Sequence, residues 1–470
     1  MPPEMESTAA PPLRKAKTPL RKESTPLRKV VALLLLVGVI AGWLYFNRLG
    51  EPRAPVWDET YYLTTTARYH QGLTQFSSHP PLGTMLIAAG DQLIGKNAGA
   101  DWHAIGAAKA ITREEMPPGF DYAGPRLAPA AAGVIAAVLF ALLMVQLTGS
   151  VPAAAALSLL VLADSALLVQ FRTAQLDAFQ LVFVLAALLS ALWALRRQSR
   201  WAYILFGLFV AAAALVRANG LMMGALAPFM LWPLLQERDW RGLALRILNG
   251  LHGAFLAAIV VLAAWIHFTS LPPDVNTPAG RQDMAFVSPQ HAYAWKYDAW
   301  NLRTALAAAS DIQRFMAHDL AITPHADANG SHPAQWLIGQ GLIRYRTDAA
   351  GAQPVSIGLV PNLAVWLISL LGVLTSLIPA RLKESPLRAM LLAGWIANMA
   401  ALQWLDFHRV LYLYHYFIPL LLGHAMAALE WRHHGLPRRP ALILAPLVVA
   451  AGVLAWPLAT GRMPLGWLIG

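Results

Sequence analysis

Long apolar runs dominate this sequence and restrict what it can fold into. The first run is Val30 to Phe46, and ten further runs of membrane-spanning length follow it. Only 13% of the 470 residues are charged, against about 25% in a soluble domain, and the mean hydropathy is +0.48. We therefore expect an all-α integral membrane bundle of about eleven transmembrane helices. The later runs are 127–147, 151–171, 176–195, 201–216, 219–235, 247–268, 357–379, 387–404, 410–431 and 440–460.

Two long polar segments interrupt these runs, at about 47–125 and 269–356. They divide the chain into a membrane core over 30–268, which contains the first long loop, a second long loop over 269–356, and C-terminal membrane helices over 357–470. The connector at 47–51 has no small-x-small cleavage pattern, so we expect the first run to stay as an anchor rather than to be removed as a signal peptide.

A basic, Pro-rich tail over 1–29 precedes the first run. It repeats Pro-Leu-Arg-Lys at 12–15, 19–22 and 26–29. One interpretation is an electrostatic contact with the anionic lipid headgroups of the membrane. The other, which we favour, is a disordered tail whose charges only fix the orientation of the protein.

The formal net charge of +11 lies mainly in this tail and in short connectors between apolar runs. That distribution fits membrane orientation better than a nucleic-acid-binding face. If the N-terminus is cytoplasmic, the basic connectors face the cytoplasm and both long loops face outward. We expect a multi-pass protein of the cytoplasmic (inner) membrane whose active site lies on the outer, periplasmic face. The basic connectors are 196–200, 237–246, 381–388 and 432–439.

The sequence excludes several kinds of chemistry. It contains no cysteine, so disulfides, thiolate metal sites and a cysteine nucleophile are excluded. We find no Walker loop, no dinucleotide-binding glycine pattern and no His-Glu-x-x-His. A nucleotide-sugar or ATP site therefore has no support, and an activated donor would arrive through the membrane.

The most informative motif lies in the first long loop. Asp58-Glu59 is followed by Tyr61-Tyr62, a short helical stretch and His79-Pro80-Pro81. A carboxylate at the membrane surface can take a proton from an acceptor hydroxyl, or it can bind a divalent cation. The two prolines fix the direction of the His79 imidazole, which can then meet a phosphate. Alternatively, both groups are simply solvated loop residues.

Arginines at the predicted outer ends of the apolar runs form a second candidate group. Ionisable residues bordering membrane spans usually face a polar cavity or a partner, and the planar guanidinium fits phosphate. The alternatives are interfacial snorkelling, an Arg172–Asp177 ion pair and an aromatic belt. Helical spacing would place Arg409, Tyr412 and Tyr416 near one face. The candidates are Arg126, Arg172, Asp177, Arg217, Arg409, Tyr412 and His415.

These motifs, in this order, resemble the protein O-mannosyltransferases, which transfer mannose from a dolichyl- or polyprenyl-phosphate carrier and have the GT-C fold. The resemblance covers about residues 30–430, and the first-loop motif is its most specific part. The matching elements are Asp58-Glu59, His79-Pro80-Pro81-Leu82-Gly83, Pro125-Arg126-Leu127, Arg172 to Asp177, Ala214 to Gly220 and Arg409 to Pro419.

The resemblance implies an inverting transfer of a hexose, with mannose expected, to Ser/Thr hydroxyls of an exported protein. It implies that Asp58 is the base, that Glu59 supports it, and that the carrier phosphate meets basic side chains. No metal is implied with certainty. The more distantly similar lipid A aminoarabinose transferases have Lys-Pro-Pro-Leu where this chain has His-Pro-Pro-Leu, which supports a phosphate role at position 79. The residues implied for the phosphate are His79, Arg126, Arg217 and Arg409.

The chain departs from the family pattern on the side of the acceptor. Ser331-His332-Pro333 and Trp336 keep only part of the later outer-loop motif, and Pro361-Asn362-Leu363 stands where the family has Gly-Asn-Pro. The segment 269–356 is too short for an additional β-trefoil. A lipid or glycan acceptor therefore stays open, as does a transporter or a lipid-binding scaffold. The sequence shows no repeated halves of the kind found in many transporters.

Overall fold

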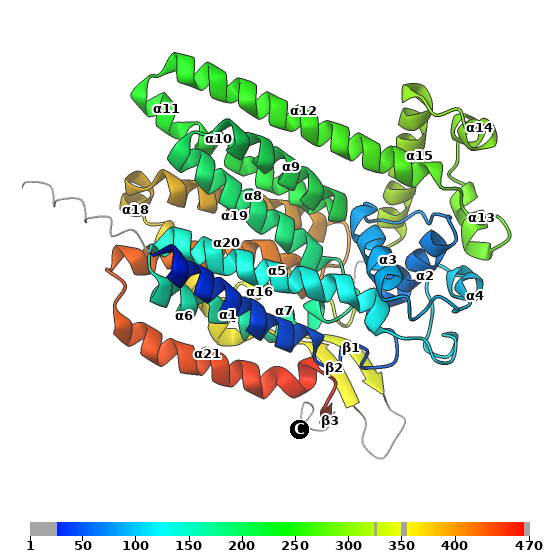
Figure 1. The fold of residues 1–470 in the computed structure, drawn as a ribbon, viewed down its shortest axis with the longest axis horizontal. Coiled ribbons are helices and arrows are strands. Elements are labelled where there is room, and N and C mark those ends of the chain that lie inside the picture. The colour runs from blue at the N-terminus through cyan, green and yellow to red at the C-terminus, as the bar shows by residue number, and fades with distance from the viewer. Residues whose placement is uncertain (1–25, 324–326, 349–354, 465–470) are drawn as a thin grey trace, which may run out of the picture.

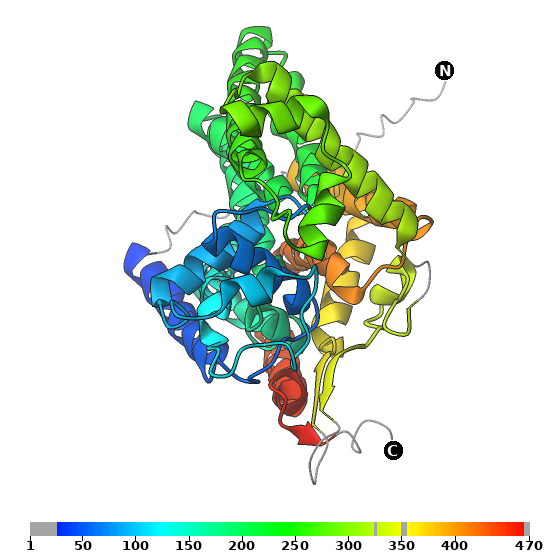
Figure 2. The same cartoon turned by 90° about the vertical axis from the view of Figure 1, so that its right-hand side faces the viewer.

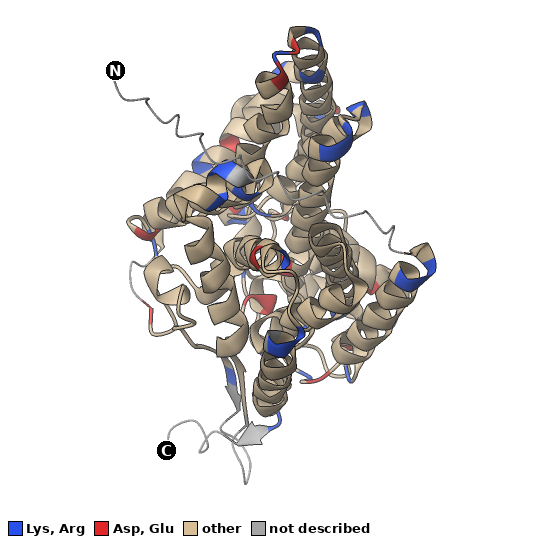
Figure 3. Cartoon of the chain, turned by 90° about the vertical axis from the view of Figure 1, so that its left-hand side faces the viewer, with Lys and Arg blue, Asp and Glu red and all other residues tan. Residues whose placement is uncertain are grey.

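The structure is a computed structural model that describes residues 26–323, 327–348 and 355–464. Its long helices run side by side along the horizontal axis of Figure 1, and the short helices of both long loops gather at one end. Figure 3 looks onto the opposite end and shows Lys and Arg at the ends of several helices. The first two Pro-Leu-Arg-Lys repeats lie outside the described residues.

The predicted apolar runs form helices. Within the described residues, six helical segments are long and apolar enough to cross a membrane, and a bent pair makes up to seven. The all-α, multi-pass fold is thus confirmed, whereas the count of about eleven spans stays a prediction. The six segments are α1 (Leu27–Phe46), α5 (Ala123–Thr148), α8 (Asp177–Arg197), Ala218–Glu237, α12 (Trp240–Ser270) and most of α21 (Arg438–Ala459).

The bundle also contains shorter helices, and one predicted run is sharply bent. The run predicted at 151–171 divides into α6 (Val151–Leu162) and α7 (Ser165–Phe171), which meet at 67°. Asp164 causes the break, because its carboxylate accepts from the Leu167 amide at 2.9 Å and so caps α7. The remaining helices of the bundle are α9 (Arg200–Val216), α17 (Leu363–Ser376), α18 (Pro379–Glu384), α19 (Pro386–Asp406) and α20 (Phe417–His433).

The run predicted at 219–235 is helical but irregular. It consists of the 3₁₀ helix η1 (Ala218–Leu226), then α10 (Ala227–Met230) and α11 (Trp232–Glu237). Pro228 and Pro233 each stand in the first turn of their helix, where the missing amide hydrogen is tolerated.

The first long loop folds into three helices at one end of the bundle. These are α2 (Glu59–His70), α3 (Leu82–Ile94) and α4 (Trp102–Gly106). Pro81 immediately precedes α3, so the second proline of the motif leads directly into a helix. Gly83 lets α3 sit close to the bundle, since a Cβ there would lie 2.7 Å from a methyl group of Leu176.

The second long loop is also largely ordered structure. Figure 2, which faces this end, shows its helices beside those of the first loop. A short antiparallel sheet, in the order β1-β2-β3, follows them. The elements between α12 and α17 are α13 (Pro278–Met284), α14 (Pro289–Tyr297), α15 (Leu302–Ile322), α16 (Pro333–Trp336), β1 (Ile343–Asp348) and β2 (Val355–Leu359). The third strand, β3 (Met463–Pro464), follows α21 and pairs with β2.

The start of the predicted run 410–431 is not an α-helix. Tyr412 is extended, with φ −131° and ψ 153°, and the 3₁₀ turn η2 (Leu413–Tyr416) follows before α20 begins. The expectation that Arg409, Tyr412 and Tyr416 share one helical face is therefore wrong. The Tyr416 ring is instead buried beside Trp366, with 5.2 Å between the ring centroids.

Candidate active site

A cavity of about 440 Å³ lies between the two long loops and the adjoining ends of the bundle helices. Its wall comes from the start of α2, the segment before α3, the end of α9, α15, and the segment before α20. Six of the residues predicted from the sequence line it, although they are far apart in the chain. They are Asp58, His79, Arg217, Arg409, Tyr412 and His415.

Asp58 is placed so that its carboxylate is available to the cavity. It is the residue immediately before α2, where an aspartate usually accepts a hydrogen bond from the first turn, but its side chain makes no such bond. The Tyr414 hydroxyl donates to Oδ2 across a long 3.5 Å. Burial raises the pKa of Asp58 to about 6, against the lowering effect of Arg217. A base with a pKa near neutrality suits proton transfer from a hydroxyl group.

Glu59 points away from the cavity, although it is adjacent to Asp58 in the sequence. Its two oxygens meet Nε of Arg126 at 2.7 Å and Nη2 at 2.8 Å, and they also accept from the amides of Val56 and Ala174. Consecutive helical residues differ in direction by about 100°, which explains the separation. The two carboxylates therefore do not form a joint cation site. Within the described residues, no group of three His, Asp or Glu side chains is arranged to hold a metal ion.

Arg126 is fully buried and does not line the cavity. Besides Glu59, its guanidinium donates to the carbonyls of Pro52 and Ala54, both at 2.9 Å. All of its nitrogen atoms are thus engaged in holding the start of the first long loop against α5. This arrangement gives no support to the expected contact between Arg126 and a carrier phosphate.

Arg172 likewise lies outside the cavity wall. It donates from Nη1 to the Leu44 carbonyl at 2.8 Å, which satisfies an acceptor in the last turn of α1. The ion pair considered between Arg172 and Asp177 is not present. Asp177 pairs instead with Arg217, with 3.2 Å between Oδ2 and Nη2, so Asp177 supports the cavity wall from behind.

Arg217 contributes a buried cation to the cavity. The chain is extended at Arg217 directly after α9, so the side chain leaves the helix end toward Asp177 and Tyr414. The Tyr414 ring centroid lies 5.1 Å from the guanidinium carbon. Its Nε is buried without a hydrogen-bond partner among the described residues. A buried donor of this kind favours an anionic ligand.

His79 and Arg409 complete the basic side of the cavity. Burial, together with Arg217 and Arg409, lowers the pKa of His79 well below its usual range. A neutral imidazole can still donate one hydrogen bond to an anion. His415 lies beside them, and its Nδ1 is 2.8 Å from the Tyr412 carbonyl oxygen. Cationic and hydrogen-bonding groups thus face the same space as the Asp58 carboxylate.

Several cavity residues were not predicted from the sequence. Tyr414 contacts both Asp58 and Arg217, and α15 supplies Asp319, whose carboxylate accepts from the Ser78 hydroxyl. Tyr414 lies within the matching segment Arg409 to Pro419, where Tyr412 and Tyr416 stand beside it and no spacing distinguishes it. The second loop carried no motif that marked Asp319. His332, by contrast, pairs with Asp406 at 3.0 Å and does not line the cavity.

The fold and this cavity define a polytopic membrane protein of the GT-C type. The sequence profile described as dolichyl-phosphate-mannose-protein mannosyltransferase matches residues 35–271, half of the chain. The chain belongs to this family. The match contains Asp58, His79 and Arg217, whereas Arg409 and His415 lie beyond it.

Individual relatives agree with this assignment. Protein O-mannosyl-transferase 1 of Mus musculus is 29% identical over 227 residues, covering 46% of this chain and 29% of the relative. The Homo sapiens protein of the same name is 34% identical over 146 residues, covering 31% of this chain and 19% of the relative. The matches thus span less than a third of these relatives' length.

Solved structures share the fold. The S. cerevisiae protein O-mannosyltransferase complex bound to the sugar donor has a TM-score of 0.75 at 12% identity and covers 92% of this chain and 90% of that chain. The Archaeoglobus fulgidus oligosaccharyltransferase has a TM-score of 0.52 at 14% identity, and the match covers 92% of this chain and 53% of that chain. At these identities the likeness concerns the fold alone, and it confirms the predicted GT-C architecture.

Proposed function

We propose that this protein transfers a hexose, expected to be mannose, from a polyprenyl-phosphate carrier to Ser/Thr hydroxyls of exported proteins. The reaction takes place at the outer face of the cytoplasmic membrane. The observation that carries the proposal is the cavity, which is lined by the carboxylate of Asp58 together with the cations Arg217 and Arg409. Membership of the mannosyltransferase family supports the choice of donor and acceptor.

In this mechanism Asp58 is the general base. It takes the proton of the acceptor hydroxyl as that oxygen attacks the anomeric carbon of the sugar. The bond between this carbon and the phosphate oxygen breaks, and its electron pair leaves with the polyprenyl phosphate. One displacement inverts the configuration. Glu59 is paired with Arg126, so Asp58 is the member of this adjacent pair that faces the cavity, where the Tyr414 hydroxyl donates to it. This supports the assignment.

The basic side of the cavity binds the carrier phosphate. Arg217 and Arg409 offset the negative charge that grows on the leaving phosphate, and His79 and His415 orient it by hydrogen bonds. Asp177 holds Arg217 in place through their ion pair. Tyr412 forms the wall between Arg409 and Tyr414 and packs against Trp57, with 5.3 Å between the ring centroids.

The test is a transfer assay on the purified protein in liposomes. The donor is radiolabelled polyprenyl-phosphate-mannose, and the acceptor is an extract of exported proteins and lipids from the host. Asp58→Asn should lower transfer to protein by about 10²–10⁴-fold, the usual contribution of a general base. The matched control is Asp298→Asn, at an exposed left-handed position that asparagine also tolerates, and it should keep full activity.

Each other outcome has a definite meaning. Label in lipid instead of protein would keep the chemistry and replace the acceptor. Full activity of Asp58→Asn would remove Asp58 from the role of base. Failure of every carrier-linked sugar as a donor would favour a transporter.

A further inference from the structure

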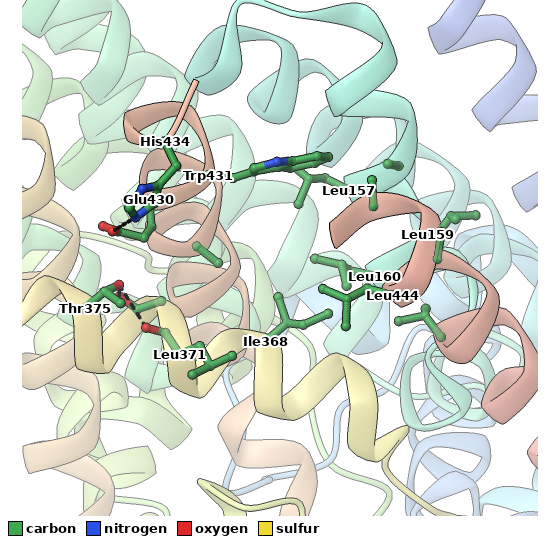
Figure 4. A pocket seen from close by; sticks show the side chains of 16 residues that line it. Leu157, Leu159, Leu160, Ile368, Leu371, Thr375, Glu430, Trp431, His434 and Leu444 are labelled. Atoms are coloured by element: carbon green, nitrogen blue, oxygen red, sulfur yellow. Dashed lines mark hydrogen bonds and ion pairs between the residues drawn. The ribbon is translucent and has the colours of Figure 1, made fainter. Parts of the chain in front are cut away.

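A second cavity lies between helices of the bundle, away from the candidate active site. It has a volume of about 330 Å³ and is bounded by α6, α17, α20 and α21. Figure 4 shows Leu157, Leu160, Ile368 and Leu444 among the side chains that surround it. The Thr375 hydroxyl on its wall already donates to the Leu371 carbonyl at 2.9 Å. The cavity therefore offers little to hold water and suits a hydrocarbon chain.

The helix α21 forms the outer wall of this cavity, and most of it is exposed. Only 11% of its apolar window is buried inside the protein. Leu442, Ile443, Leu447 and Leu454 are exposed on it, as expected for a helix that faces membrane lipid. An unfilled gap beside such a helix would lose dispersion contacts, which a lipid chain can restore.

Glu430 and His434 stand at one end of the cavity wall, and Arg381 and Arg388 lie behind Glu430; we call this region the basic end. Glu430, at this end, meets Nη2 of Arg381 at 3.3 Å, Nη1 of Arg388 at 2.9 Å and Nε2 of His434 at 3.0 Å. Figure 4 shows the contact between Glu430 and His434 at the cavity wall. The two connectors here, 381–388 and 430–439, contain six Lys and Arg against two Glu in the sequence. The positive charge thus exceeds what Glu430 neutralises.

The basic end is remote from the candidate active site. The candidate active-site residues Tyr412 and His415 precede the first residue of α20, whereas Glu430 and His434 stand at its other end. The 17 residues of α20 correspond to about 25 Å of helix. That separation places the second cavity in the opposite leaflet from the proposed donor site.

We infer that this cavity, with its basic end, binds an anionic phospholipid of the bilayer. One acyl chain fills the space between α17 and α21, and the phosphate lies at Arg381 and His434. The headgroup is expected to be anionic, because basic pockets between transmembrane helices bind anionic headgroups. Each Lys or Arg near the membrane surface raises the affinity for anionic lipid about fivefold. The inference does not depend on the proposed glycosyl transfer.

The test is native mass spectrometry of the full-length protein from vesicles with equal phosphatidylglycerol and phosphatidylcholine. We expect retained phosphatidylglycerol to exceed phosphatidylcholine, and Arg381→Ala to reduce that preference about fivefold. Ala445→Trp fills the cavity from α21 and should abolish retention. The controls are Arg303→Ala, exposed on α15, and Ala258→Trp, on the exposed face of α12, and both should behave as wild type.

Three results would overturn the inference. One is equal retention of both lipids with no effect of Arg381→Ala, which would exclude the anionic headgroup. Another is undiminished retention by Ala445→Trp, which would place the lipid elsewhere. The third is a rise in the unfolding temperature with inorganic phosphate alone that equals the rise with phosphatidylglycerol, which would leave only an anion site. Because Arg381→Ala and Ala445→Trp act on different parts of the lipid, the test survives if one variant fails to fold.

Discussion

At the scale of single residues, Tyr414 connects the two sides of the candidate active site. Its hydroxyl donates to Asp58, and its ring packs against the guanidinium of Arg217. The hydrogen bond lowers the pKa of Asp58, whereas burial raises it to about 6. Since the base must be ionised to accept a proton, activity should rise with pH through about 6.

Tyr414→Phe tests this connection because it keeps the ring and removes the hydroxyl. Without the hydrogen bond the pKa of Asp58 rises further, so the rising limb of kcat/KM against pH should move upward by about one unit or less. Tyr412→Phe is the matched control, because the Tyr412 hydroxyl makes no hydrogen bond to Asp58, and its limb should stay in place. If the limb does not move in Tyr414→Phe, the Tyr414 hydroxyl has no effect on the pKa of the base.

The Glu59–Arg126 pair shows why Asp58 and Glu59, although adjacent in the sequence, have different roles. Two adjacent carboxylates predicted a shared function, but the helix directs Glu59 into the protein and Asp58 into the cavity. A buried charge without its partner costs about 3–5 kcal/mol of stability. Arg126→Met should therefore lower the unfolding temperature strongly, because Glu59 would stay buried and unpaired.

The double variant Glu59→Gln/Arg126→Met distinguishes structure from phosphate binding. Removing both charges should restore much of the stability and, with it, the affinity for the polyprenyl-phosphate donor. Thermal unfolding and donor binding on the same samples provide the measurement. A double variant that is stable but does not bind the donor would show that Arg126 is needed to bind the carrier phosphate.

At the scale of elements, the apolar runs predicted the helices well because burial in lipid requires long apolar segments. The breaks within the runs depend on single side chains, which periodicity does not show. Asp164 caps α7 inside a run that looked continuous, and Tyr412 is extended where a helix was expected. The helix α15 lacked any motif, so its Asp319 became a candidate only when the fold brought it to the cavity.

At the scale of the whole molecule, the two ends of the bundle differ in both charge and structure. The long loops and the candidate active site lie at one end, and basic connectors such as 432–439 lie at the other (Figures 1 and 3). The positive-inside rule predicts that the basic end is cytoplasmic. The orientation also decides whether the donor is reached from the outer leaflet.

The absence of cysteine allows this orientation to be measured directly. Lys296→Cys, exposed on α14, should react with a membrane-impermeant maleimide in intact cells. Arg439→Cys, exposed at the start of α21, should react only after the membrane is permeabilised. The reverse pattern would place the candidate active site in the cytoplasm.

The most direct test of the central claim measures donor binding and transfer side by side in two variants. The claim is that one cavity contains both the base and the groups that bind the carrier phosphate. Asp58→Asn should bind polyprenyl-phosphate-mannose as wild type does and fail to transfer it. Arg409→Ala should bind the donor about tenfold more weakly or worse, as expected for the loss of a charged hydrogen bond. Full transfer by Asp58→Asn, or unchanged donor affinity in Arg409→Ala, would contradict the account.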